Sequence, residues 1–359
     1  MNEEKKMILD MLKEGKITVE QASDLLEAVG KDKSKNNEES FIDKLSTSFE
    51  KVMKKTSETI SNFDFDFDFD LDNVNIPNIY HINSQKSENQ TKIDDDINEI
   101  EINLINGSLD IQRAQENHIM VEEKVYFKNK EDQKNDYLNI TVVEDKLIIS
   151  VNENYRSLDA SANVKLYLGK NIYDKLDVNI INGQVELCDV DFKENNIEST
   201  NARFTLINTA GNIDLKNTNG KIEIRNTNGD LEVSNVNGSV YLANVSGKNA
   251  NVDLVNGSIR IDGLNMENVD LASKAGSIRI FKIIDAKNVN MATQFGSVVV
   301  DTNEFNKNIK ALIKSSSYSI ADKFKNKLQT KDGYQVSTDP EESDLDLDIK
   351  SAFGRVSLR

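Results

Sequence analysis

The alternation of apolar and polar positions is most regular between Asn196 and Asp301. Its clearest part, residues 208–247, reads NTAGNIDLKNTNGKIEIRNTNGDLEVSNVNGSVYLANVSG. Two apolar residues flank a polar one in each unit, as in Ile213/Leu215 and Ile222/Ile224, and this period of two predicts short strands with one buried face. Glycine, often after asparagine, supplies the positive φ of a corner. It recurs every nine residues, at Gly211, Gly220, Gly229, Gly238 and Gly247.

Farther along, the unit doubles to 17–20 residues with two strands each, a period typical of solenoids. The first series of strands takes in 213–215 and 231–233 and continues at 252–254, 269–271 and 289–291. The second series takes in 222–224 and 240–242 and continues at 259–261, 278–280 and 298–300.

Two architectures fit this pattern. Asn-Gly between alternating strands is also a strong hairpin signal, so an antiparallel β meander or sandwich is the alternative. We favour a parallel β-solenoid, mainly β, because the same residue types return in the same phase. Stacked coils then bury a continuous apolar column, and the corner asparagines can form a ladder of hydrogen bonds.

The strand repeats predict a β-domain over residues 97–359. Longer apolar stretches at 119–127, 137–143 and 147–151 predict hairpins that cap the first coils. After Val300 the coils become irregular, residues 322–343 are expected to form a loop, and LDLDIKSAFGRVSL is expected to form the final coil.

The N-terminal third has a different pattern. Residues 1–30 predict a small α-helical hairpin that docks on a copy of itself or on another element, and residues 31–96 predict a linker. Within the linker, 41–62 form an amphipathic helix that suits either a protein partner or an anionic membrane surface. FDFDFDFDLD, residues 63–72, predicts an acidic edge strand rather than a calcium site, because a strand presents its carboxylates in a line.

Charge and cysteine content exclude several classes of partner and site. A net charge of −17 in 359 residues argues against a nucleic-acid partner. The single cysteine, Cys188, excludes an internal disulfide, and with no histidine nearby in sequence it is expected to be structural rather than nucleophilic. The N-terminus shows no signal peptide, and no stretch is apolar enough for a transmembrane segment. We therefore expect a cytoplasmic protein, with membrane association as a further option.

The outward residues of the repeats are the candidate surface. Those of the first series are Asp214, Glu232, Asp253 and Asp270, and those of the second are Glu223, Tyr241, Arg260 and Arg279. In-register coils would align the first four as an acidic stripe. We expect a solvated polar face, with docking of a divalent cation or a cationic peptide as the alternative. No phosphate-binding, metalloprotease or nucleophile motif is present, so we predict no catalytic, cofactor-binding or metal-ligating residue and no cofactor.

Two segments resemble known modules. KEGKITVEQASDLLEAVG resembles the SHOCT-like hairpin at the N-terminus of Gram-positive proteins, and the later N-G-S-[VIL]-x-[VIL] units are similar to a β-strand-repeat domain named "putative adhesin". The pair resembles LiaX/YvlB-type proteins linked to cell-envelope stress. The resemblance implies a non-enzymatic interaction protein in envelope-stress sensing or signalling. Its partners would be proteins, membrane-associated regulators among them, and residues 1–30 could form a homo-oligomer. The alternatives are a cell-surface adhesin and, less favoured, a carbohydrate-active β-helix enzyme.

Overall fold

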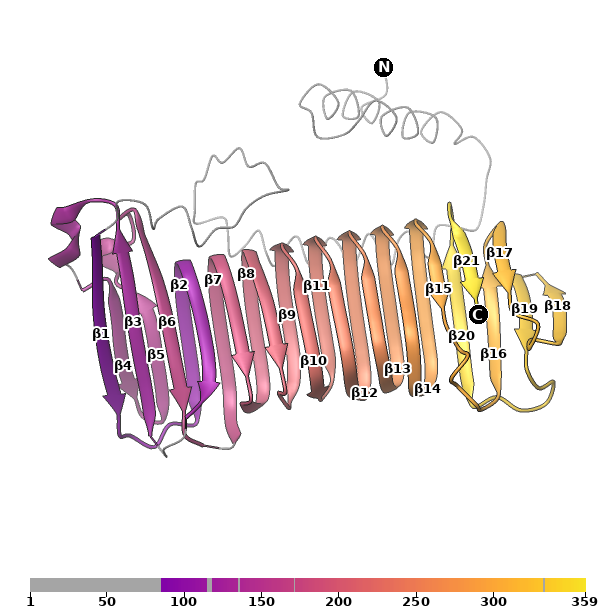
Figure 1. Ribbon diagram of the computed structural model, residues 1–359, viewed down its shortest axis with the longest axis horizontal. Helices are drawn as coiled ribbons and strands as arrows, with labels where there is room; N and C mark the ends of the chain where they lie inside the picture. Colours follow the sequence, from indigo (N-terminus) through magenta and orange to yellow (C-terminus); the bar gives the residue numbers. More distant parts are fainter. Residues whose placement is uncertain (1–84, 115–117, 135, 171, 332) are drawn as a thin grey trace, which may run out of the picture. The chain divides into compact units, whose positions relative to one another are not determined.

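The computed structural model describes residues 85–114, 118–134, 136–170, 172–331 and 333–359. The predicted hairpin (1–30), the amphipathic helix (41–62) and the acidic strand (63–72) lie outside these residues. The described part is nearly all strand, wound into a stack of parallel coils (Figure 1). The predicted parallel β-solenoid is therefore confirmed for the repeats, and the antiparallel meander is not the architecture.

Nine strands form the regular coils, in which each coil pairs in parallel with the next. Val233, for example, lies between Leu215 of the coil before it and Val252 of the coil after it. The strands are β7 (Ile172–Cys188), β8 (Asp191–Ile207), β9 (Asn212–Asn219), β10 (Ile222–Asn228), β11 (Leu231–Asn237), β12 (Val240–Asn256), β13 (Ile259–Ala275), β14 (Ile278–Phe295) and β15 (Val298–Val300).

Each regular coil has two main faces. We call the face that contains Leu231–Ser234 the first face, and the face that contains Ile222–Arg225 the second face. Inward side chains on both faces, such as Val233 and Ile224, are buried and stack into one apolar core. Outward side chains form straight rows along the stack, because the pairing is in register from coil to coil.

Two columns of residues hold the corner at which the first face ends and the second face of the same stack begins. Five side-chain hydrogen bonds of 2.6–2.9 Å link successive asparagines in the predicted ladder, which runs through Asn106, Asn182, Asn201, Asn219, Asn237 and Asn256. Beside it, glycines stack so closely that a Cβ on Gly257, whose φ is +143°, would lie 1.6 Å from the carbonyl oxygen of Gly238. Only glycine fits this backbone.

The N-terminal end is closed by strands that do not stack in the order in which they occur along the chain. β2 (Glu99–Arg113) lies between β7 on one side and β5 and β6 on the other. Antiparallel pairs β1–β3, β3–β6 and β4–β5 surround it, which confirms the predicted capping hairpins. The remaining elements are β1 (Gln85–Ile93), β3 (Ile119–Phe127), η2 (Lys130–Lys134), β4 (Leu138–Val143), β5 (Lys146–Val151), η3 (Glu153–Tyr155) and β6 (Ala160–Leu168).

One expectation at this end is corrected. The sequence was expected to remain linker as far as residue 96, yet β1 occupies Gln85–Ile93 and pairs along its whole length with β3. Its polar composition hid it, because β1 is an edge strand with mostly exposed side chains.

The C-terminal end also contains a coil that lies between strands from two different parts of the chain (Figure 1). The last coil pairs with β14 and β15 on one side and with β16 and β17 on the other. It is the final coil in sequence, as expected, but not the outermost in space. The strands are β16 (Ile309–Lys314), β17 (Ser317–Ile320), β18 (Asn326–Thr330), β19 (Gly333–Ser337), β20 (Leu345–Ser351) and β21 (Arg355–Leu358).

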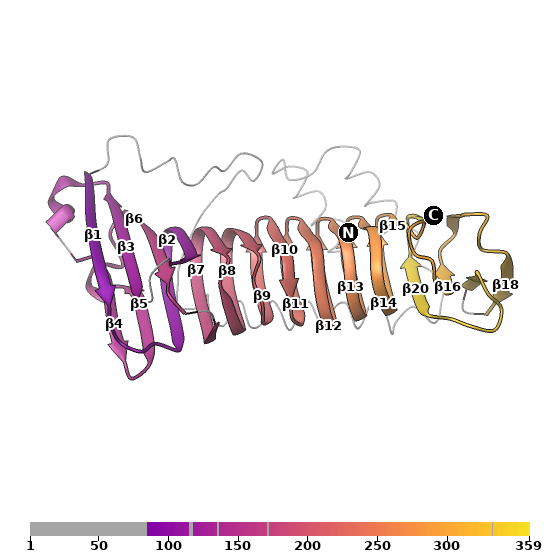
Figure 2. The same ribbon diagram turned by 60° about the horizontal axis from the view of Figure 1, so that its bottom comes forward.

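The expected loop at 322–343 is also wrong. It contains the antiparallel pair β18–β19, which extends the stack beyond β16. Figure 2, turned by 60°, shows this hairpin at the end of the stack opposite to β1. The pattern was missed because the outward side chains of β18 are polar and its one large apolar residue, Leu328, is 61% exposed.

Candidate functional site

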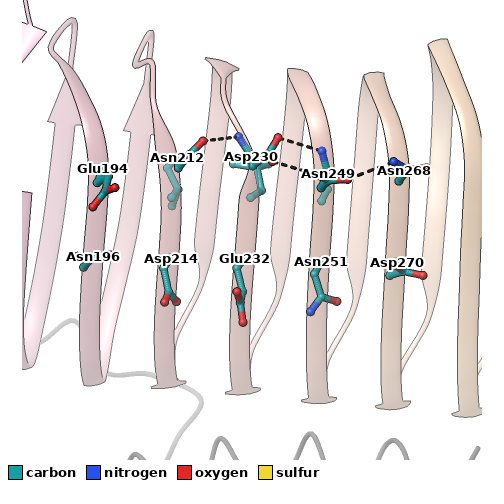
Figure 3. Close-up of a pocket in the computed structure, with 13 residues that line it drawn as sticks. Glu194, Asn196, Asn212, Asp214, Asp230, Glu232, Asn249, Asn251, Asn268 and Asp270 are labelled. Carbon is teal, nitrogen blue, oxygen red and sulfur yellow. Dashed lines mark hydrogen bonds between the residues drawn. The ribbon is translucent and has the colours of Figure 1, made fainter. Parts of the chain in front are cut away.

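A shallow groove of about 400 Å³ crosses five coils of the first face. Two parallel rows of polar side chains line it (Figure 3). The corner row consists of Glu194, Asn212, Asp230, Asn249 and Asn268. The face row consists of Asn196, Asp214, Glu232, Asn251 and Asp270.

The corner row is held rigidly by hydrogen bonds. Asp230 Oδ1 accepts the backbone N–H groups of Lys248 (2.9 Å) and Asn249 (3.0 Å), and its Oδ2 accepts Asn249 Nδ2 at 2.9 Å. These bonds, the Asn249 N–H first, hold the pKa of Asp230 below its ordinary value. Asn268 donates in turn to Asn249 Oδ1 at 3.1 Å. Asp230 is therefore a fixed negative charge at one wall of the groove.

The face row is hydrogen-bonded in part, since Asn196 Nδ2 donates to Asp177 Oδ1 at 2.9 Å and Asp270 Oδ1 accepts Asn290 Nδ2 at 2.7 Å. Asp214 pairs through Oδ2 with Lys216 Nζ at 2.7 Å, but its Oδ1 is buried with no hydrogen-bond partner among the described residues. Adjacent members of the row are one strand spacing apart, about 4.8 Å. The row thus presents carboxylate and carboxamide oxygens at regular intervals along the stack.

The register corrects the predicted acidic stripe. Asp214, Glu232 and Asp270 do share one row, with Asn251 between the last two. Asp253 does not: it aligns with Ser234 and Ala272 in the neighbouring row. The predicted strand, 252–254, lies two residues too far along the chain. Ala250 points inward but is a weak hydrophobic signal, whereas Val252–Leu254 has the apolar–polar–apolar pattern of the repeat.

In that neighbouring row, Asp253 is flanked by small side chains and is largely buried. Burial raises its pKa to about 6, and the nearby charges of Asp270 and Glu232 add to this, partly offset by the Asn251 amide. Asp253 therefore titrates close to neutral pH while facing the same side as the groove.

The second face differs in charge. Glu223, Tyr241, Arg260 and Arg279 share one row, as predicted. Glu223 pairs with both Lys221 and Arg225, and these pairs lower the pKa of its carboxyl, the Lys221 contact first. The Arg225 guanidinium also lies over the Tyr241 ring, 4.8 Å from its centroid.

Neither face concentrates groups for catalysis. Among the described residues no three His, Cys, Asp or Glu side chains are placed to hold a metal ion. Burial raises the pKa of the Cys188 thiol, whose contact at 3.5 Å is Asp189, so the thiol form prevails and the residue lacks the activation of a nucleophile. No helix in the described ranges has the length and hydropathy required to cross a membrane.

These features define a capped parallel β-solenoid with polar, ladder-like faces. The chain belongs to the Toastrack DUF4097 family, whose model matches residues 97–359. The model of a SHOCT-like domain matches residues 3–34, in agreement with the resemblance of the N-terminal hairpin. The comparison with curated proteins found no match.

Solved structures similar to this chain include three proteins from two Parabacteroides species. A "putative adhesin" from Parabacteroides distasonis is 12% identical, with a TM-score of 0.40, over 77% of this chain and 98% of that chain. A "putative lipid binding protein" from the same species is 11% identical, with a TM-score of 0.37, over 76% and 97%. A "putative adhesin" from Parabacteroides merdae is 11% identical, with a TM-score of 0.36, over 77% and 98%.

Sequence reasoning missed half of the groove. The corner row has no apolar alternation of its own, so its residues were not among the predicted outward positions of the repeats. The signal that could have found it is the recurrence of Asn or Asp immediately before each inward residue of the first face, as in Asn212, Asp230, Asn249 and Asn268.

Proposed function

We propose that this chain is a non-enzymatic interaction protein of the cell-envelope stress response, in which the first-face groove docks a partner protein. The single observation that supports this most is the in-register row of carboxylate and carboxamide side chains, which extends over five coils beside the hydrogen-bonded corner row. An extended partner segment that donates hydrogen bonds and carries positive charge would complement it.

The N-terminal segment supplies the second part of this proposal. The SHOCT-like match at residues 3–34 and the basic amphipathic stretch at 41–62 support recruitment of a membrane-associated regulator or self-association. We place the protein in the cytoplasm, in contact with the membrane surface. An adhesin would instead expose the β-domain outside the cell.

Site-specific crosslinking in cells tests the docking role. A photoreactive residue replacing Asn251, in the groove, should capture a discrete partner, and capture should rise after treatment with a cell-wall antibiotic. The triple variant Asp214→Asn, Glu232→Gln, Asp270→Asn should lose that product at equal protein level. A matched triple outside the groove, Asp262→Asn, Glu304→Gln, Glu342→Gln, should retain it.

Two results would refute the proposal. One is a crosslink pattern that neither stress nor the groove triple changes. The other is digestion of the β-domain by protease added to intact cells, which would assign the chain to the cell surface and favour the adhesin.

A further inference from the structure

The coil of β14 contains two bulges that bring large apolar side chains to the surface. Against β13, the register passes from Ile280 to Lys282 and from Ile283 to Asp285, so Phe281 and Ile284 have no opposite residue. These two bulge residues are 50% and 49% exposed, which places them among the most exposed large hydrophobic residues of the described chain. Bulges commonly re-aim a side chain at a functional position.

Two arginines lie beside the first bulge, and no carboxylate among the described residues pairs with them. Arg260 and Arg279 are directly opposite each other on adjacent parallel strands, and neither forms an ion pair within the described residues. The Nε of Arg279 is buried and has no hydrogen-bond partner there. Like charges in opposite positions destabilise a sheet. The pair therefore carries a cost that an external anion would remove.

Elsewhere on the second face the same kind of charge is neutralised internally. Glu223 pairs with Lys221 and Arg225 on its own coil, two coils before Arg260 and three before Arg279. Next to the arginine pair, Lys282 is neutralised by Glu304 at 2.7 Å, and Asp262 follows Arg260 on the same face at a distance too long for an ion pair. The excess positive charge is thus confined to Arg260 and Arg279, two residues before Phe281.

We propose that Arg260 and Arg279 on the second face, Phe281 at the end of that face and Ile284 just beyond the corner at Gly263 form a docking site for an anionic lipid surface. The guanidinium groups would contact lipid phosphates, and the two apolar side chains would enter the interfacial layer. A soluble polyanion would complement the arginines, but it would gain nothing from two protruding apolar side chains, so the bulges favour a lipid surface. This inference rests on the bulge geometry and stands independently of the groove and of the envelope-stress role.

Flotation of the full chain with vesicles tests the site. Vesicles of equal parts phosphatidylglycerol and phosphatidylcholine should bind the protein, and vesicles of phosphatidylcholine alone should not. The variants Phe281→Ser/Ile284→Ser and Arg260→Gln/Arg279→Gln should each reduce the partition coefficient about tenfold. Phe281→Ser/Ile284→Ser should leave the thermal unfolding transition unchanged because both side chains face outward, and Arg260→Gln/Arg279→Gln should not lower it because it removes the like-charge pair.

Matched controls separate this site from general effects. Leu328→Ser/Phe353→Ser removes two side chains of similar exposure on other coils, and Lys248→Gln/Lys274→Gln removes two exposed charges of the first face. Both should change partitioning by less than about twofold.

Three outcomes would overturn the proposal. In the first, the parent chain fails to float with anionic vesicles. In the second, all variants float equally, which would assign binding to another segment such as 41–62. In the third, soluble polyphosphate binds in an arginine-dependent manner while vesicles do not, which would identify a polyanion site instead.

Discussion

The regular coils and the two ends of this solenoid obey different rules. From β7 to β15 the coils follow one another in chain order, with parallel neighbours in register except at the bulges between β13 and β14. At each end, a coil lies between neighbours from two different parts of the chain: β2 between β7 and β5/β6, and β20/β21 between β14/β15 and β16/β17. Repetition thus specifies how coils stack, whereas non-repetitive excursions specify where the stack stops.

The corner columns show the same contrast. The asparagine ladder continues through Asn256 and then gives way to Ala275 and to Phe295, which stacks on Phe353 with ring centroids 5.2 Å apart. An amide ladder needs a partner in both neighbouring coils, whereas an aromatic stack can end at an open face. The change of side chain marks the approach of the C-terminal cap.

The largest difference between the regular coils and the C-terminal end should appear when the inserted coil is removed. Deletion of residues 345–359 removes five buried side chains, Leu345, Leu347, Ile349, Val356 and Leu358, whose burial contributes about 10 kcal/mol. We expect residues 302–344 to become protease-sensitive while the coils up to β13 stay protected. Limited proteolysis with mass spectrometry of the fragments measures this. Persistent protection of β16–β19 would show that the cap folds without the inserted coil.

Glycine substitutions should separate the regular coils from the cap. Gly257→Ala puts a Cβ 1.6 Å from a backbone oxygen that neighbouring coils hold in place, and we expect a loss of about 3 kcal/mol or more. Gly333→Ala, in the β18–β19 hairpin, puts a Cβ 2.5 Å from the carbonyl oxygen of Ile313, a smaller overlap than at Gly257, so a smaller loss of about 2 kcal/mol is expected. Urea unfolding gives both values.

Ala202 provides the control for this series. It occupies the glycine column between Gly183 and Gly220 without a positive φ, so Ala202→Gly should cost less than about 1 kcal/mol. Equal losses at Gly257 and Gly333 would mean that the coils relax as easily as the cap.

The corner ladder should matter more than the aromatic stack that follows it. Asn237→Ala deletes one donated and one accepted hydrogen bond, of 2.8 and 2.9 Å, in a column with no room to rearrange, and should cost about 2 kcal/mol. Phe353→Ala removes a stacked but 66% exposed ring and should cost about 1 kcal/mol or less. Thermal unfolding ranks the two, and the reverse order would contradict the ladder's role.

A smaller effect is expected at Asp253. Its folded-state pKa of about 6 lies above the ordinary 3.8, so the native state binds the proton more tightly and stability falls as pH rises from about 4 to about 6. Asp253→Asn mimics the protonated form and should raise stability at pH 7.5 by about 1 kcal/mol, with no gain near pH 3.5. Urea midpoints at the two pH values measure this, with Asp262→Asn as a pH-independent control.

Much of the middle of the molecule was predictable from its sequence. Period-two alternation and corner glycines predicted the parallel coils, and the asparagine ladder follows from identical residues in identical phase. The register was harder to predict, as Asp253 shows, because the coil length changes from 18 residues (Ile213 to Leu231) to 19 (Leu231 to Ala250) without a strong apolar marker. The N-terminal capping hairpins were predicted, but the inserted coil at the C-terminal end could not be derived, since nothing local in LDLDIKS distinguishes an inserted coil from an outermost one. The two bulges of β14 likewise emerge only when 280–285 is aligned in space with 261–265.

The position of β20 and β21 has a consequence for biosynthesis. Residues 345–359 fill a gap inside the stack, so β16 and β17 cannot join the regular coils until this later segment has been translated. A chain that stalls before residue 345 leaves β14 and β15 with an unpaired apolar edge, which quality-control proteases can recognise. The order of translation thereby delays closure of this end until the inserted coil has been made.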